Sequence, residues 1–179
     1  MKRSIPALLA LLACTAATTA PRQTACDTRG WGATAKTVVL ADPSPGARVL
    51  AIIPRRAATE RGEDINGTFP EFDIKAASNG WFRIVHVTFG DYGDPAPLRP
   101  VFAGQGWVHG SQIGGQLCGG ERFYAGPSER AHSRPLPAAA DEVKIRRLLD
   151  CQGNWVKVDA DIGIGWVRSF SNNQVTTCA

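Results

Sequence analysis

Three short sequence signatures occur twice along this chain, in the same order each time. They are, in chain order, LADPS at 40–44, GWFRI at 80–84 and GQGWV at 104–108, then YAGPS at 124–128, GNWVKV at 153–158 and GIGWV at 163–167. A repeated order of this kind is typical of the duplication of one structural unit. The spacing is wider in the first copy, which indicates that this copy carries insertions. The chain is therefore expected to fold as two related units.

The local pattern within each copy is that of β-strands. Large apolar residues nearly alternate with other residues over 81–87 and 155–158, and the same alternation begins at 143–149. Clusters of Gly, Asp and Pro separate these segments and mark turns. About five short strands per copy predict an all-β protein made of two tandem small five-stranded barrels, the first with long loop insertions.

The first twenty residues have the layout of an export signal. Lys2 and Arg3 give a positive start, residues 5–13 are apolar, and residues 15–20 are all small. The apolar segment is far shorter than the roughly 20 residues that a membrane-spanning helix needs. Two cleavage sites remain open. Cleavage before Cys14, within LLAC, resembles lipoprotein processing and would leave a lipid anchor, whereas cleavage within 15–20 would release a soluble periplasmic or secreted protein.

The cysteine count agrees with export. Of five cysteines, Cys14 is either lipidated or removed with the signal, which leaves an even set of four: Cys26, Cys118, Cys151 and Cys178. Four cysteines in an exported chain indicate two disulfides, and three connectivities are possible for them.

The ordered signatures resemble those of bacterial Src-homology-3-type (SH3b) domains, which are small five-stranded barrels common in cell-envelope proteins. The closest likeness lies in GWVHGSQI at 106–113 and GWVRSF at 165–170. The resemblance implies a first SH3-like domain at 36–118 and a second at 123–179. A linker at 119–122 joins them, and an N-terminal segment at 21–35 precedes them.

This division of the chain also suggests how the cysteines pair. Cys26 and Cys118 flank the first copy, and Cys151 and Cys178 belong to the second. Barrels this small bury little surface, so a disulfide in each would add needed stability. We therefore expect the pairs Cys26–Cys118 and Cys151–Cys178.

Cys151 is also a candidate nucleophile, because DCQG at 150–153 superficially resembles the motif of NlpC-type cell-wall peptidases. Such a cysteine needs a histidine base, and in that family the histidine follows the cysteine. No histidine follows Cys151, and the three histidines, His86, His109 and His132, have no zinc-site spacing. The chain is expected to be no enzyme and to use no metal or cofactor.

The two insertions, at 55–70 and 90–100, are the candidate functional loops, since long loops in compact domains are often functional. The second contains Tyr92, Leu98 and Arg99, and Tyr and Arg are frequent in binding hot spots. We take these three residues, with Tyr124 of the second copy, as candidate ligand contacts. A solvated loop without a role is the alternative reading of these insertions.

The repeated tryptophans allow two interpretations. Trp81, Trp107, Trp155 and Trp166 occupy matching positions in the two copies, which favours packing in or beside the core. The alternative is an aromatic groove for a ligand.

Charge narrows the choice of partner. The formal net charge is +4, falls by two when Lys2 and Arg3 are removed, and includes no basic run, so nucleic acid is not an expected partner. The resemblance implies a binding module for cell-wall peptide or for an envelope protein, with membrane contact only through a lipid on Cys14. The alternative function is a periplasmic inhibitor or immunity-type lipoprotein that blocks a cell-wall hydrolase.

Overall fold

The protein is all-β, as the sequence pattern predicts. The computed structural model describes residues 22–56, 66–91, 100–117, 122–137, 143–168, 170–171 and 174, which form three antiparallel sheets and one short 3₁₀ turn, η1 (Gly110–Gln112). No sheet closes on itself within these residues, so the barrel form of each copy stays a prediction. No helix in the described part of the chain could span a membrane.

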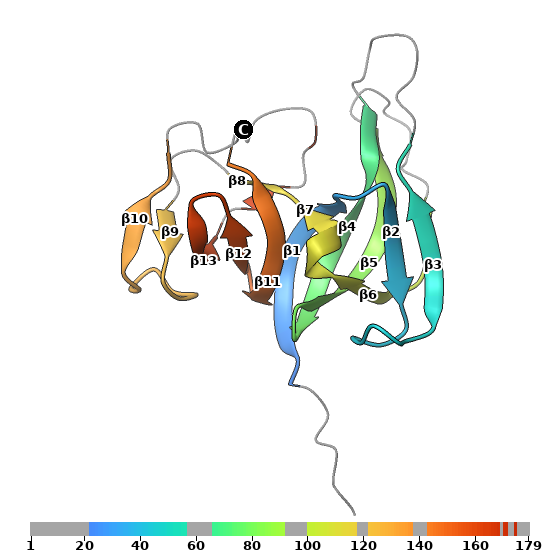
Figure 1. The fold of residues 1–179 in the computed structure, drawn as a ribbon, viewed down its shortest axis with the longest axis horizontal. Helices are drawn as coiled ribbons and strands as arrows, with labels where there is room; N and C mark the ends of the chain where they lie inside the picture. The colour runs from blue at the N-terminus through green and yellow to red at the C-terminus, as the bar shows by residue number, and fades with distance from the viewer. Residues whose placement is uncertain are drawn as a thin grey trace, which may run out of the picture.

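The largest sheet contains the first copy and has seven strands (Figure 1). Its strand order is β3-β2-β6-β5-β4-β1-β7. The strands are β1 (Thr24–Gly32), β2 (Lys36–Leu40), β3 (Val49–Pro54), β4 (Asn66–Ser78), β5 (Trp81–Asp91), β6 (Gly106–His109) and β7 (Ile113–Gly114).

The second copy forms a sheet of five strands in the order β10-β9-β13-β12-β11. Two further strands pair with each other to form a third, small sheet. The strands of these two sheets are β9 (Arg122–Tyr124), β10 (Ser133–Pro135), β11 (Ile145–Gln152), β12 (Trp155–Ala160) and β13 (Gly163–Val167), and β8 (Gln116–Leu117) with β14 (Phe170–Ser171).

The two copies share strand order and register. Within the first sheet, β3-β2-β6-β5-β4 repeats the order of the whole second sheet. Trp107 lies opposite Leu40 across β6 and β2, and Trp166 lies opposite Tyr124 across β13 and β9. The loops that follow match as well: Ala41 N–H donates to the carbonyl of residue 48, and Ala125 N–H to that of residue 132, both at 2.9 Å. The two parts of the chain thus share a strand order and matching hydrogen bonds, while their division into two tandem domains stays a prediction.

β1 is the strand that the duplication does not predict. It lies in the segment at 21–35 that was set outside both copies, yet it pairs with β4 along most of its length. Its other side reaches the second copy, where Asp27 N–H donates to Gly153 O at 2.6 Å and Gly153 N–H donates to Ala25 O at 2.9 Å. β1 therefore joins the two sheets (Figure 1).

The expected disulfide pairing is wrong for both described cysteines. Cys26 of β1 bonds to Cys151 of β11, with their Cα atoms 5.6 Å apart. The bond links the copies rather than closing either one, because β1 runs beside the end of β11 and brings Cys26 against Cys151. Cys118 and Cys178 lie outside the described residues, as does Cys14.

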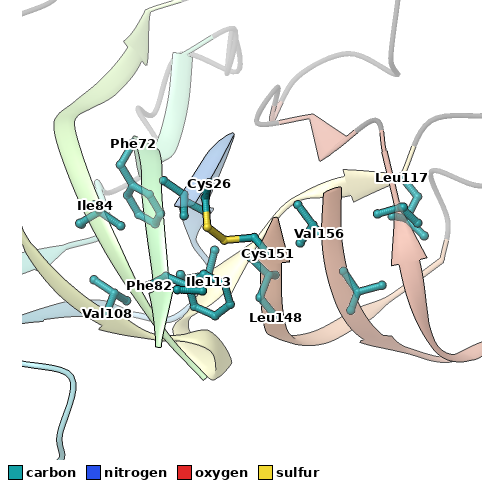
Figure 2. Packing of buried hydrophobic residues seen from close by; sticks show 14 of the residues in the cluster. Cys26, Phe72, Phe82, Ile84, Val108, Ile113, Leu117, Leu148, Cys151 and Val156 are labelled. Carbon is teal, nitrogen blue, oxygen red and sulfur yellow. A yellow bond between two sulfur atoms is a disulfide. The ribbon is translucent and has the colours of Figure 1, made fainter. Parts of the chain in front are cut away.

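The buried side chains form one cluster that continues across the disulfide from one sheet to the other (Figure 2). Phe82 and Ile113 belong to the first side, and Leu148 and Val156 to the second; each is at most 1% exposed. η1 contributes to this contact, since a Cβ on Gly110 would meet the Leu148 carbonyl oxygen. The two copies therefore pack through a common apolar core.

The first insertion, at 55–70, is not wholly a loop. β4 begins at Asn66 and has 13 residues, and β5 has 11, whereas the matching β11 and β12 have 8 and 6. Much of the extra length of the first copy thus extends a β-hairpin. Residues 57–65 and 92–99 lie outside the described part of the chain.

Candidate functional site

One face of the second sheet carries a row of polar and aromatic side chains. Asp150, Lys157, Trp166 and Tyr124 are successive cross-strand partners on β11, β12, β13 and β9. Directly opposed residues project from the same face of an antiparallel sheet. The intervening residues on β12, such as Val156, are fully buried, so the row lies on the outer face.

A hollow of about 230 Å³ lies at the Tyr124 end of this row. Its walls come from β9, β10, β13 and the loop that precedes β10. The lining residues are Phe123, Tyr124, Ala125, His132, Arg134 and Ile164. We call this hollow the Tyr124 groove.

The side chains of the groove are held in place by contacts behind it. The ring of Tyr124 meets the ring of Trp155 edge to face, with centroids 4.9 Å apart. The guanidinium of Arg134 lies over the Phe123 ring, 5.0 Å from its centroid, and donates to the Ile162 carbonyl. Stacked and hydrogen-bonded side chains lose less entropy when a ligand binds, so this groove is partly preorganised.

The backbone explains why Phe123 can lie under the groove. A Cβ on Gly165 would be 2.5 Å from Cε1 of the Phe123 ring, which is closer than real side chains allow. In the first copy a Cβ on Gly106 would be 2.4 Å from Cγ1 of Val39. The glycine of each Gly-Trp-Val signature therefore lets the side chain of a neighbouring strand pack directly on the sheet.

The chemistry of the groove suits a short peptide. Tyr124 offers an aromatic wall, and Ile164, which is 60% exposed, adds an apolar surface beside it. Arg134 adds a permanent positive charge with several N–H donors. An apolar side chain together with an acidic group would match these surfaces.

Charged side chains are fixed elsewhere on the same face. Asp159 accepts hydrogen bonds from Arg146, the shortest at 2.7 Å, and from Arg147 at 3.2 Å. The hydrogen bond from Arg146 is the largest of the effects that lower the pKa of Asp159 below 3.8. On the first sheet, a hydrogen bond from Lys75 to Asp27 likewise lowers the pKa of Asp27 and raises that of Lys75.

Of the four predicted ligand contacts, only Tyr124 can be placed, and it lies in the groove. Tyr92, Leu98 and Arg99 fall outside the described residues. Sequence reasoning missed His132, Arg134 and Ile164. A signal existed for Ile164, because it stands between Gly163 and Gly165 where the strand alternation requires an outward side chain.

The tryptophans divide between the two interpretations. Trp107 and Trp166 are 6% and 8% exposed, so both are buried, although Trp166 projects from the outer face of the second sheet. Trp81 and Trp155 are only partly buried, and each meets another ring: Trp81 that of His109 at 5.0 Å, and Trp155 that of Tyr124. Trp155 thus belongs to the support of the groove.

The remaining candidates for chemistry contact other side chains. His86 Nδ1 lies 3.0 Å from Asp73 Oδ2, and His109 Nδ1 lies 2.7 Å from Ser111 Oγ. Cys151 is bonded to Cys26. The described residues contain no group of three or more histidine, cysteine or acidic residues that could hold a metal.

Comparisons with known proteins return no relative. No protein-family model, no curated protein and no solved structure matches the chain.

Proposed function

We propose that this protein is an exported, non-enzymatic binding module of the bacterial envelope that captures a short cell-wall peptide in the Tyr124 groove. Its two copies are proposed to be SH3-like units, a reading that rests on the ordered signatures and the repeated strand order. The groove is the observation that carries the proposal, because it combines an exposed aliphatic side chain, an aromatic wall and a fixed cation.

Cell-wall stem peptides have the matching chemistry. They are short chains of small apolar residues interspersed with free carboxylates. Ile164 and Tyr124 would cover an alanine-type methyl group, and the guanidinium of Arg134 would pair with a carboxylate. A shallow groove on a strand face suits an extended peptide better than a compact metabolite, which is usually enclosed on most sides.

Two observations support an exported role without catalysis. The Cys26–Cys151 disulfide is compatible with an oxidising compartment outside the cytoplasm. The same bond occupies the one cysteine that the sequence offered as a nucleophile. A peptide-binding protein needs neither a base nor a metal.

The proposal is tested by sedimenting the purified, oxidised protein with insoluble peptidoglycan. The unaltered protein is expected to sediment with it. Ile164→Thr and Tyr124→Leu are expected to reduce the bound fraction, each with about a tenfold or larger loss of affinity, as for a buried aromatic or aliphatic contact. Leucine is the residue that the first copy has at the position of Tyr124, so this change should preserve the fold.

The matched control is Ile52→Thr. Ile52 is 57% exposed on a β-strand, as Ile164 is at 60%, but it lies on β3 of the first copy, away from the groove. This variant should sediment like the unaltered protein. Equal binding by all three variants, or no sedimentation at low salt, would show that the groove does not bind the cell wall.

A further inference from the structure

A second hollow lies where the two copies meet. Its volume is about 500 Å³, and its walls come from the start of β1, the turn between β4 and β5, and the strands β11 and β12. The lining residues are Arg22, Thr24, Ala77, Ser78, Asn79, Gly80, Leu149, Asp150 and Lys157. We call it the junction hollow.

The junction hollow carries an excess of positive charge. Arg22 and Lys157 both line it, and neither forms an ion pair within the described part of the chain. Its one acidic residue, Asp150, already accepts the backbone N–H of Cys151 at 2.8 Å through Oδ1. Two cations without partners beside a partly satisfied carboxylate favour an anionic ligand.

A buried hydroxyl marks the same place. Ser78 is 2% exposed, and its Oγ has no hydrogen-bond partner among the described residues. Buried polar groups in proteins nearly always have a hydrogen-bond partner. A buried hydroxyl without one, beside a hollow, therefore indicates that a bound ligand supplies the partner. A ligand carboxylate that reaches the inner wall would accept a hydrogen bond from this hydroxyl.

The walls of the hollow are fixed to one another. Thr24 stands two residues before Cys26, and Asp150 stands next to Cys151, so the disulfide ties the opposite sides together. Asn79 and Gly80 form a tight turn with φ angles of 50° and 80°. A site whose walls are cross-linked costs little reorganisation when it binds a ligand.

The two hollows lie at the two ends of the same row of side chains. Asp150 and Lys157 line the junction hollow, Tyr124 lines the groove, and Trp166 lies between them on the same face. The three steps between neighbouring strands from Asp150 to Tyr124 span about 14 Å, and the two steps from Lys157 to Tyr124 span about 10 Å. An extended chain of about three to four residues covers these lengths.

From this arrangement we propose that the junction hollow binds the C-terminal carboxylate of the same peptide that occupies the Tyr124 groove. The inference rests on the proposed function and assigns the peptide its direction: the carboxylate meets Lys157 and Arg22, the chain crosses Trp166, and an apolar side chain reaches Tyr124 and Ile164. The ligand class is then a peptide of about three to four residues with a free terminal carboxylate, since extended chains of that length span the distance from the hollow to the groove.

The test compares one stem tetrapeptide, Ala-γ-D-Glu-Lys-D-Ala, prepared as the free acid and as the C-terminal amide. Binding to the full, oxidised protein is measured by calorimetry. The acid is expected to bind about tenfold more tightly than the amide, as a charge-assisted hydrogen bond requires. Lys157→Gln is expected to remove this preference, and Lys144→Gln, the same change at an exposed lysine outside the hollow, is expected to keep it.

The outcomes separate the two proposals. If both peptides bind equally well and Tyr124→Leu weakens both, the groove is a binding site and the junction hollow is not. If the acid is preferred but the preference depends on Arg134 rather than Lys157, the carboxylate lies in the groove and the direction proposed here is wrong. If neither peptide binds to the unaltered protein, the proposed function fails, and this inference fails with it.

Discussion

The two copies have the same arrangement of strands but different side chains on them. Their strands have the same order, and a register shift in β4 between Ile74 and Ala76 recurs in β11 between Leu148 and Asp150. At matching positions, however, Leu40, Arg48 and Leu50 of the first copy correspond to Tyr124, His132 and Arg134 of the second. The groove of the second copy therefore differs from the first copy in side chains rather than in the arrangement of strands.

The copies also differ in the number and length of their strands. The first is extended by β1 and β7 and by a long β4–β5 hairpin, while the second stays at five short strands. Ala77 of the first copy and Cys151 of the second both lie opposite fully buried partners, Phe82 and Val156. The smaller, second sheet is cross-linked to β1 of the first sheet by the Cys26–Cys151 disulfide. Because the second sheet has fewer and shorter strands, we expect it to lose more stability than the first when this disulfide is broken.

The largest expected effect comes from removing that link. The double variant Cys26→Ala/Cys151→Ala opens a cross-link between residues 125 apart in sequence, and the free energy of unfolding should fall by about 4 to 5 kcal/mol. Guanidinium denaturation followed by tryptophan fluorescence measures the loss. Alanine suits position 151 because the matching position in the first copy is already Ala77.

Two results would contradict this account of the disulfide. A loss below about 1 kcal/mol would be far less than loop closure predicts, and would show that the second copy is stable without the link. Mass spectrometry of the unreduced protein should give a peptide containing Cys26 joined to one containing Cys151. A Cys26–Cys118 link in its place would contradict the fold itself.

The second effect tests whether the glycine before the tryptophan is needed for close packing between strands in both copies. Gly106→Ala and Gly165→Ala each force a Cβ into a neighbouring side chain, so each should lower the unfolding free energy by about 1 to 3 kcal/mol. Gly106→Ala should cost more, because its Cβ would also approach the Leu40 carbonyl oxygen to 2.9 Å. Gly46→Ala, with open space around its Cβ, is the control and should be nearly neutral. Equal stability of all three variants would exclude close packing at these strands.

The third effect concerns the ring contact between Tyr124 and Trp155, whose counterparts in the first copy are Leu40 and Trp81. Tyr124→Leu and Trp155→Leu, made singly and together, form a double-mutant cycle whose coupling energy should be about 0.5 to 1.5 kcal/mol. The corresponding cycle in the first copy, Leu40→Ala with Trp81→Leu, should show less coupling, because Leu40 has no ring and the ring of Trp81 meets that of His109 instead. Equal coupling in the two copies would mean that the edge-to-face contact contributes nothing specific.

The smallest effect is electrostatic. Hydrogen bonding and charge from Arg146 lower the pKa of Asp159, so this carboxylate stabilises the folded state at pH values above its unfolded pKa near 3.8. The contribution disappears as the pH falls through the lower pKa of the folded state. A carbon-detected NMR titration should place Asp159 below 3.8 and Arg146→Gln should raise it. Asp27 should respond to Lys75→Gln in the same way on the first sheet, and an unchanged Asp159 pKa in Arg146→Gln would overturn the assignment of cause.

Much of the fold could be predicted from local pattern. The alternation over 155–158 and at 81–87 identified β12 and β5, and the repeated signatures identified the duplication. β1 could not be found in this way, because the segment TACDTRGWG lacks regular alternation and its partners, β4 and the end of β11, are distant in sequence. The pairing of Cys26 depended on β1, so the expected disulfide was wrong for the same reason.

The candidate site was predictable only in part. Tyr124 was identified by its residue type and position, and the structure places it in the groove. Arg134 and His132 gave no such signal, since they lie in a short polar strand and the loop before it, and charged residues there usually contact only water. Their role depends on the packing of Arg134 over Phe123, which joins residues of two different strands.

The sequence by itself determined the strand pattern, the twofold repeat and the glycines that permit close packing, because these depend on residue size and spacing within a few positions. Tertiary structure alone decided how the copies are joined, which cysteine meets Cys26, and that Asp150, Lys157, Trp166 and Tyr124 form one row. These outcomes depend on which strands become neighbours. Strand pairing depends on which arrangement buries apolar surface best over the whole molecule, so no local stretch of residues encodes it.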